Sequence, residues 1–463
     1  MRRTIASGAV LVLLAVSATF AYAQTTAQST ATGTDPFLWL EDVHGARAMA
    51  WVKAQNARTL GVLQGDPNFA GLYAAALKIV EAKDRIPTPS FIQQQVYNFW
   101  QDEDHVRGIW RFTTPSSFGS TSPAWTTALD LDALAKAENA NWVWKGADCH
   151  WPAENRCLVS LSDGGEDAIT LREFDLNDKR FVTGGFTLSR GKQSAAWEDA
   201  DNLLVAREWS PGDLTTSGYP FIVKRVRRGQ PISSAVEVFR GSKSDGGYGV
   251  APLALHDGAG HNAIIIARPL STFTAEYYIM TPSGPQKLNV PLKSQPAGLV
   301  AGRLLFIIQE DWNLNGSAFP QGSLVSLDLA ASLADPKNLK PSLVYAPGPR
   351  ETLDNVAQTS SRLLLTTYEN VRGRAWVYTP IAGNAWSKQR LALPENSSIV
   401  IDDADQHGET AYLTVTSFLT PPTLWQLDAG TGQVAVVKTS PARFDASNDV
   451  VEQREAVSKD GTH

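Results

Sequence analysis

The sequence predicts a mainly β protein, a β-propeller of about seven blades that follows a short helical segment. Two observations predict this fold. From about residue 86, short apolar or alternating runs are separated by Gly, Pro, Asp and Asn turns, which is the pattern of a sandwich, barrel or propeller. In the same region a loose unit recurs, in which a polar turn leads into an aliphatic strand, a polar loop and a second strand. A sandwich would not need so many copies of one unit, so the repeat favours a propeller.

Five copies of this unit can be read at intervals of roughly 50 residues, which is close to the length of one four-stranded blade. Their middle residues are Leu204, Ile265, Leu305, Leu364 and Leu413. Two hairpins are predicted earlier in the chain. The first pairs residues 94–100 with 108–113, and the second pairs 156–161 with 169–176. The span 86–440 then has room for about seven blades of this length.

Two helices are predicted within residues 24–85. The clearer one begins after Asp66, which can cap it, with Pro67 in the first turn. Apolar side chains then recur at helical spacing at Phe69, Leu72, Tyr73, Ala76, Leu77 and Val80. An earlier helix around residues 48–63 has a less regular apolar pattern. The regular helix has one apolar face that needs a partner.

The first 23 residues have the pattern of a secretory signal peptide. Arg2 and Arg3 form a positive start, residues 9–16 are apolar, and an Ala-Tyr-Ala site ends at Ala23, which predicts cleavage before Gln24. A membrane anchor is the alternative, but a spanning helix needs about 20 apolar residues and this stretch is shorter and interrupted. No later segment is long and apolar enough to span a bilayer. We therefore expect a periplasmic or secreted chain.

Composition and charge are those of an ordinary globular protein without a nucleic-acid partner. Hydrophobic residues make up 43% of the chain and charged residues 19%, which allows a large core. The net charge is −6, whereas binding to phosphates needs clustered Lys and Arg. One dense basic run is expected to form a solvated strand face and turn: Lys224, Arg225, Arg227 and Arg228.

The chain has two cysteines, Cys149 and Cys157, on either side of a short loop that contains a Trp-Pro pair. In an oxidising compartment this arrangement predicts a disulfide bond. The alternative is two buried free thiols that act as small hydrophobic groups. A zinc site is not expected, because His150 is the only imidazole nearby and no second pair of ligands has suitable spacing.

No motif for a catalytic serine is present in residues 1–463. A serine hydrolase on an α/β scaffold shows GxSxG at a strand-to-helix turn, followed by an Asp and then a His. The nearest approach, residues 242–247, lacks the first glycine and precedes no helix, so it is interpreted as a propeller loop. The seven histidines form no HExxH pair and are expected to be surface or hydrogen-bonded groups. Phosphate-binding glycine motifs are absent too, so neither a metal nor a cofactor is expected.

Three segments resemble the prolyl oligopeptidase family of serine peptidases. Residues 35–42 (Asp-Pro-Phe-Leu-Trp-Leu-Glu-Asp) are similar to the family's opening Asp-Pro-Tyr-x-Trp-Leu-Glu-Asp, and Trp51 falls where a helix tryptophan often follows. Residues 417–425 resemble part of the family's last blade. Residues 458–462 (Ser-Lys-Asp-Gly-Thr) resemble the start of its hydrolase domain. These segments occur in the family's order.

The resemblance implies a seven-bladed propeller over an α/β-hydrolase domain, with a Ser-Asp-His triad at the interface. The expected parts are a signal peptide (1–23), a helical segment (24–85), the propeller (86–440) and the first residues of the hydrolase domain (441–463). All three triad residues would follow the Ser-Lys-Asp-Gly-Thr segment, so no catalytic residue is assigned and residues 1–463 alone are expected to be inactive. The sequence is interpreted as a truncated gene product or an incomplete sequence.

The family's propeller limits substrate size by covering the active site. The resemblance therefore implies a short peptide, cleaved after proline, as the partner of the full-length enzyme. The loop 213–220 could face the substrate tunnel, although a plain inter-strand loop is favoured. No other substrate-binding residue is assigned. The absence of a Glu-Glu pair on a helical insertion favours endo-oligopeptidase action. The alternative function is a secreted, non-catalytic propeller that binds a peptide, glycan or protein.

Overall fold

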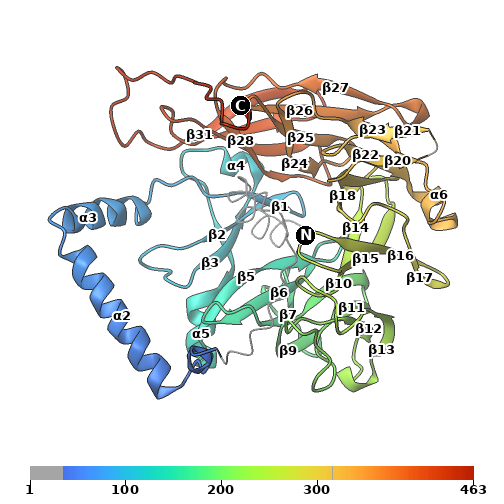
Figure 1. Cartoon of the computed structure of the whole chain (residues 1–463), viewed down its shortest axis with the longest axis horizontal. Coiled ribbons are helices and arrows are strands. Elements are labelled where there is room, and N and C mark those ends of the chain that lie inside the picture. The colour runs from blue at the N-terminus through green and yellow to red at the C-terminus, as the bar shows by residue number, and fades with distance from the viewer. Residues whose placement is uncertain (1–34, 315) are drawn as a thin grey trace. The chain divides into compact units, whose positions relative to one another are not determined.

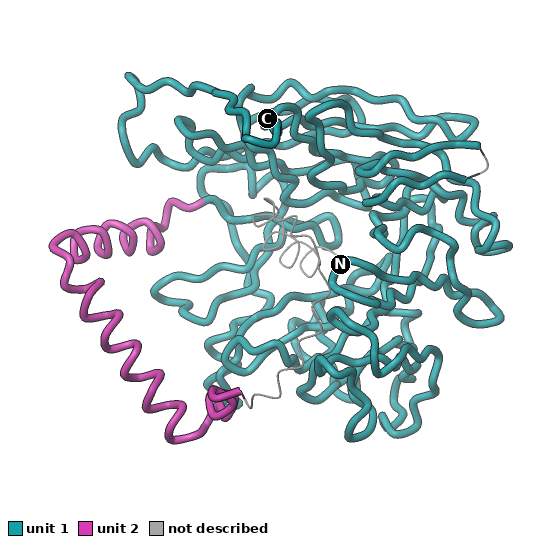
Figure 2. Tube along the Cα trace, viewed as in Figure 1, with its two compact units in different colours: residues 1–8, 86–463 teal, residues 9–85 magenta. Residues whose placement is uncertain are grey.

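The structure is a computed structural model of the chain, and it describes residues 35–314 and 316–463. The described residues belong to two compact units, one up to Arg85 and one from Ile86 to His463 (Figure 2). The predicted signal peptide and its cleavage site between Ala23 and Gln24 lie outside the described residues. No helix in the described part of the chain is long and apolar enough to cross a bilayer.

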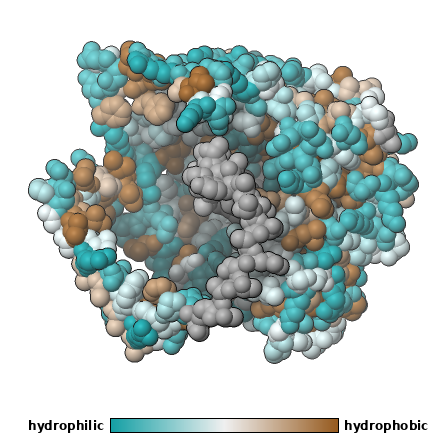
Figure 3. Space-filling model, viewed as in Figure 1, coloured by the Kyte–Doolittle hydropathy of each residue, from teal (hydrophilic) through white to brown (hydrophobic). Residues whose placement is uncertain are grey.

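The first unit is helical, as predicted. It contains η1 (Leu38–Leu40), α2 (Ala46–Gln64) and α3 (Phe69–Val80). Asp66 does not cap α3: the N-cap is Asn68, and Asp66 Oδ1 instead accepts a hydrogen bond from the Asn68 amide at 2.8 Å in the preceding turn. The helices expose large apolar side chains, several of which are on α3 (Figure 3): Leu72, Tyr73, Leu77, Ile79 and Val80.

The second unit is a β-propeller of seven antiparallel sheets, each with at least four strands, which form a ring (Figure 1). We call the space enclosed by the first strands of the blades the tunnel. Blade 1 consists of β1 (Ser90–Ile92), β2 (Gln95–Trp100), β3 (Ile109–Thr113) and β4 (Thr126–Asp130). Blade 2 consists of β5 (Trp142–Cys149), β6 (Arg156–Asp163), β7 (Ile169–Asp175) and β8 (Arg180–Phe181), and β9 (Thr187–Gly191) also pairs with β7. Blade 3 consists of β10 (Ser194–Asp199), β11 (Asn202–Ala206), β12 (Ile222–Arg227) and β13 (Val236–Arg240).

Blades 4 to 7 repeat this arrangement. Blade 4 consists of β14 (Ala251–His256), β15 (Asn262–Pro269), β16 (Ala275–Thr281) and β17 (Gly284–Lys287). Blade 5 consists of β18 (Ser294–Val300), β19 (Arg303–Ile308), β22 (Leu324–Asp328) and β23 (Ser342–Tyr345), with a separate hairpin of β20 (Trp312–Leu314) and β21 (Ser317–Phe319). Blade 6 consists of β24 (Glu351–Gln358), β25 (Leu363–Glu369), β26 (Arg372–Pro380) and β27 (Trp386–Arg390). Blade 7 consists of β28 (Ser398–Ala404), β29 (Thr410–Thr416), β30 (Thr423–Asp428) and β31 (Gln433–Thr439).

Short helices occur in the connections. They are α4 (Pro115–Phe118), α5 (Leu131–Glu138), α6 (Leu329–Ala334), η2 (Ile232–Ser234) and η3 (Ala382–Asn384). Asp130 and Asp328 begin α5 and α6 because each side chain accepts a hydrogen bond from the backbone N–H three residues later. The first strands of the blades line the tunnel, and β10, β14, β18, β24, β28 and β1 contact one another in that order.

The repeat read from the sequence corresponds to the second strand of a blade. Its five middle residues lie in β11, β15, β19, β25 and β29, and each is at most 1% exposed. Second strands pack between neighbouring blades on both faces, which explains their aliphatic runs. The two predicted hairpins are confirmed as the pairs β2–β3 and β6–β7.

Blades 1 and 7 share no strand, because each is built from one continuous segment. Side chains close the ring instead. Phe91 of blade 1 stacks on Tyr412 of blade 7 with 5.3 Å between ring centroids, and Phe118 packs edge-on against the same tyrosine. The Phe91 amide also donates a buried hydrogen bond of 2.6 Å to Asp403 Oδ2. The seam therefore depends on a few aromatic contacts and one carboxylate.

The residues after β31 form neither helix nor strand. Residues 441–463, where the resemblance implies the start of a hydrolase domain, thus have no regular secondary structure. A strand needs a neighbour to satisfy its backbone, and this segment pairs with none. Gln453 fastens it to blade 6, since its side chain donates to the Asn370 carbonyl at 3.0 Å and accepts from Arg372 Nε at 3.1 Å.

Candidate functional site in the propeller tunnel

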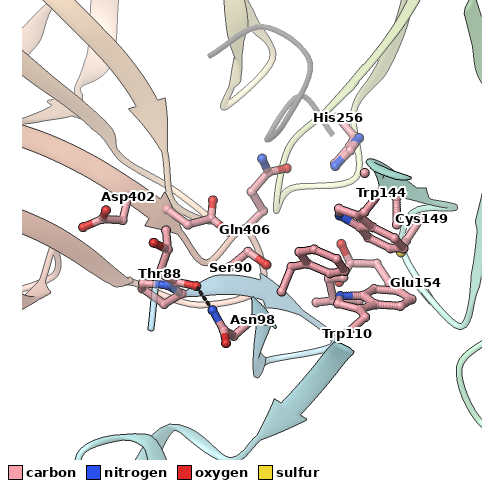
Figure 4. A pocket seen from close by; sticks show the side chains of 16 residues that line it. Thr88, Ser90, Asn98, Trp110, Trp144, Cys149, Glu154, His256, Asp402 and Gln406 are labelled. Carbon is pink, nitrogen blue, oxygen red and sulfur yellow. Dashed lines mark hydrogen bonds between the residues drawn. The ribbon is translucent and has the colours of Figure 1, made fainter. Parts of the chain in front are cut away.

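A cavity of about 210 Å³ lies along the tunnel, where the first strands of blades 7, 1 and 2 line one side of it (Figure 4). Its walls differ in chemistry. The aromatic side comes from blades 1 and 2 and the acidic side largely from blade 7. Asn98 Nδ2 donates to the Thr88 carbonyl at 3.0 Å and fixes the chain where it enters blade 1.

The aromatic wall is a stack of three rings from three strands. Phe99 of β2 stacks on Trp144 of β5 with 5.1 Å between centroids and an 8° angle between planes. Trp110 of β3 lies 5.1 Å from the same Trp144 ring. Such ring pairs add to the stability gained from their buried area, so this wall is a rigid apolar surface.

The acidic wall is built around Asp402, which occupies a β-bulge in β28. The pairing of β28 with β29 skips this residue, and the bulge turns its side chain out of the regular alternation. Thr414 Oγ1 of β29 donates a 2.7 Å hydrogen bond to Asp402 Oδ2. Burial, reinforced by the neighbouring charge of Asp403, raises the pKa of Asp402 to about 6. This carboxyl group therefore changes charge close to neutral pH.

Blade 6 contains an equivalent aspartate in a bulge, but this one does not line the cavity. Asp354 also occupies a bulge, in β24, and accepts a 3.1 Å hydrogen bond from Thr366 Oγ1 of β25. Asp354 is exposed and does not line the cavity. The two positions are equivalent in the blade repeat, so Asp354 is a matched comparison for Asp402.

One end of the tunnel is crossed by Trp151, in the turn between β5 and β6. Its ring stacks between the imidazoles of His256 and His407, with centroid distances of 4.3 and 4.1 Å. His256 ends β14 in blade 4, and His407 lies in the β28–β29 turn of blade 7. These blades are not neighbours in the ring, so a side chain from blade 2 that contacts both must lie across the tunnel.

Glu154 fixes the turn that carries Trp151. Its Oε2 accepts a hydrogen bond from the Gln93 amide of blade 1 at 2.7 Å and lies 3.2 Å from His407 Nε2. The turn is thus held by blades 1, 4 and 7 at once. We call the stacked Trp151, His256 and His407, with Glu154, the Trp151 plug.

The two cysteines flank the turn that carries Trp151 and Glu154. The structure joins Cys149 and Cys157, which are directly opposed in the β5–β6 pairing, by a disulfide bond. The bond lies at the base of the turn that carries Trp151 and Glu154. Among residues 35–314 and 316–463, no group of His, Cys, Asp or Glu is arranged to hold a metal ion.

Two loops considered from the sequence lie away from the cavity. Residues 242–247 connect blades 3 and 4 as a plain propeller loop, in which Asp245 accepts hydrogen bonds from Arg268 at 2.8 Å. Residues 213–220 connect β11 to β12 and do not line the tunnel cavity, so the inter-strand interpretation holds. Tyr219 in this loop lies under the Lys192 ammonium at 4.0 Å.

The basic run on β12 is only partly the solvated face that we expected. Arg225 donates to Glu198 of β10, two strands away in the same blade, at 2.6 Å. Arg228 donates to the fully buried Glu173 of blade 2 at 2.7 Å, because that carboxylate needs a counter-charge in the interior. The run therefore joins blades 2 and 3.

The plug and Asp402 were not identified from the sequence. Each of Trp151, His256 and His407 lies at the turn between the first and second strand of its blade, and the blade repeat brings these turns to the same end of the tunnel. Aligning the repeats on their second strands does not place the two histidines at matching positions, because His256 lies nine residues before Ile265 and His407 six residues before Leu413. Nothing in the sequence marks the bulge at Asp402.

The sheets and the tunnel are those of a seven-bladed β-propeller. Comparison of the sequence with known families identifies which kind of propeller it is. Residues 22–440 match the profile described as prolyl oligopeptidase, N-terminal β-propeller domain. The chain belongs to this family of serine peptidases. As the resemblance in the opening and closing segments implied, it carries the family's propeller.

Named relatives are peptidases. The chain is 40% identical over 435 residues to an uncharacterized peptidase, y4nA, of Sinorhizobium fredii, which covers 92% of this chain and 60% of that protein. The structure of a post-proline cleaving enzyme from Rickettsia typhi superimposes with a TM-score of 0.82 at 26% identity, covering 91% of this chain and 63% of that one. Prolyl oligopeptidase B from Galerina marginata, solved with a 25-residue macrocyclization substrate, shares the fold with a TM-score of 0.67 at 16% identity, covering 92% and 60%. The chain spans about 60% of the length of the curated relative that it matches.

Proposed function

We propose that this chain is the substrate-gating part of a serine oligopeptidase that is exported from the cytoplasm and cleaves short peptides after proline. The observation that carries the proposal is the likeness to the post-proline cleaving enzyme of Rickettsia typhi across the whole propeller. The signal-like residues 1–23 support export to the periplasm or beyond.

The tunnel geometry supports a gating role. The Trp151 plug spans one end of the tunnel and is held from blades 1, 4 and 7. A peptide in the tunnel would meet a stacked aromatic ring rather than an opening, so this end of the tunnel would exclude long chains. Access would then be limited to peptides short enough to be enclosed.

Hydrolysis itself would need a catalytic triad, which we assign to no residue among 1–463. A serine peptidase uses a serine nucleophile, a histidine that transfers the proton and an aspartate that orients the histidine. Residues 1–463 contain no GxSxG motif. Within the proposal, the chain's own residues admit and orient the peptide.

The direct test is an assay of the purified chain with a proline-containing chromogenic peptide. We expect no turnover, because nucleophile and base are not among these residues. Turnover that a serine-directed phosphonate abolishes would contradict this expectation. Reading the gene past codon 463 gives the companion result: a downstream GxSxG followed by Asp and His supports the peptidase, and a stop codon at that point overturns it.

A further inference from the structure

We propose that the tunnel cavity binds a positively charged group of a peptide, held by the Asp402 carboxylate and the Gln406 side-chain carbonyl. The group is an ammonium or a guanidinium, which carries only hydrogen-bond donors. This inference rests on the proposed function and deepens it, because it names the class of peptide that the tunnel takes.

Gln406 gives the first indication of a ligand. Its side chain lies in the turn after β28, lines the cavity and is 5% exposed. Its Oε1 is buried and accepts no hydrogen bond from any residue in the described part of the chain. Buried acceptors in folded proteins are nearly always paired, so this oxygen indicates a donor from outside the chain.

Asp402 gives the second indication of a ligand. Thr414 Oγ1 occupies one of its lone-pair positions, and a carboxylate offers about four. No Lys or Arg is among the groups that act on the Asp402 carboxyl group, which are Thr414 and Asp403. Asp402 and Gln406 both line the cavity. In Figure 4, Gln406 lies between Asp402 and His256.

The remaining lining residues favour the same class of ligand. Glu154 and Asp403 add negative charge to the cavity wall, and His256 is the one group lining it that can become a cation. The Phe99 and Trp144 stack offers an apolar surface on which the methylene stem of a Lys or Arg side chain can lie. A volume of about 210 Å³ is suited to one side chain or one chain end.

The electrostatics support a cationic ligand. The raised pKa of Asp402 reflects a buried carboxylate whose charge is poorly compensated. The groups around it are Asp403 on its own strand, Thr414 on β29 and Gln406 in the next turn, with Glu154 and His256 also lining the cavity. A bound cation would stabilise the ionised form, so affinity should rise as the pH rises through about 6.

The test is calorimetric titration of the purified chain with three versions of one short proline-containing peptide. The first has a free amino terminus, the second is acetylated and uncharged, and the third is acetylated and carries one lysine. We expect the uncharged peptide to bind about tenfold more weakly than at least one charged version, as for the loss of a charge-assisted hydrogen bond. The tighter of the two charged peptides identifies the source of the cation.

Variants locate the binding to the cavity. Asp402→Asn should reduce the affinity for the charged peptide about tenfold and leave the uncharged peptide unchanged. Asp354→Asn, the equivalent change in blade 6, should change neither. Gln406→Met removes the second acceptor and should also weaken binding of the charged peptide. Thermal melting of each variant checks that it folds.

Three results would overturn the inference: equal affinity for charged and uncharged peptides, unchanged affinity in folded Asp402→Asn and Gln406→Met variants, or no binding of any peptide. None of them bears on where the enzyme cleaves or on how substrate length affects cleavage. Those properties test the proposed function separately, by kinetics.

Discussion

Asp402 shows how one backbone irregularity changes the chemistry of a side chain. Without the bulge, its side chain would follow the regular alternation of β28. The bulge places it instead beside Asp403 in a buried position, which costs free energy when the group is ionised. A fold keeps such an unfavourable carboxylate more readily at a functional site than in a structural core.

Replacing Asp402 by Asn should therefore stabilise the protein above pH 6. The folded-state pKa of about 6 lies above the ordinary value of 3.8, so the folded state binds the proton more tightly and loses stability as the pH rises between these values. At about pH 7.5 the variant should be more stable by up to about 3 kcal/mol, and at about pH 3 the difference should vanish. Urea unfolding of both proteins at the two pH values measures this. A variant less stable than the parent at the higher pH would contradict it.

The disulfide is a second prediction at the scale of single residues. Non-reducing peptide mapping of periplasmic protein should find Cys149 and Cys157 joined. The bond closes a short loop, so we expect it to stabilise the chain by no more than about 2–3 kcal/mol in the chain-entropy model. Quantitative labelling of both thiols without prior reduction would show that the pairing is wrong.

Individual residues were harder to predict than strands. Cys149 and Cys157 could be paired because two nearby cysteines in a chain that is expected to be exported offer few alternatives. Asp402 and the Trp151 plug could not be found, because their roles depend on a bulge and on contacts between blades distant in sequence. Gln406 could not be found either, because nothing in the sequence indicates that its side-chain oxygen is buried without a hydrogen-bond partner.

At the scale of elements, local patterns were reliable where a strand or helix is determined by its own sequence. The aliphatic second strands were recognised because they are buried on both faces. The segment after β31 has no neighbouring strand to pair with, and it forms no strand.

The helices of the first unit expose apolar side chains that a monomer usually covers. Deleting residues 24–85 together with 441–463 should therefore give a more monomeric propeller than residues 24–463. Light scattering at equal concentration measures the difference. If the trimmed propeller aggregates while the longer chain stays monomeric, the helices protect the propeller and the explanation is wrong.

At the scale of the whole propeller, side chains close the ring of blades, and the Trp151 plug crosses one end of the tunnel. The seam between blades 1 and 7 relies on Phe91, Phe118, Tyr412 and Asp403. The number of blades could be estimated from the repeat length, because each blade is a nearly independent unit. The closure of the ring and of the tunnel could not, since both depend on residues about 300 positions apart meeting in space.

The most direct test of the account is the dependence of cleavage on substrate length. The enzyme expressed from the complete reading frame should be given a short peptide and an unfolded protein that contain the same proline site. We predict cleavage after proline in the short peptide with a much higher kcat/KM than in the unfolded protein, and a smaller difference when Trp151→Ala opens the tunnel. Equal kcat/KM for both substrates, or cleavage that ignores proline, would contradict the account.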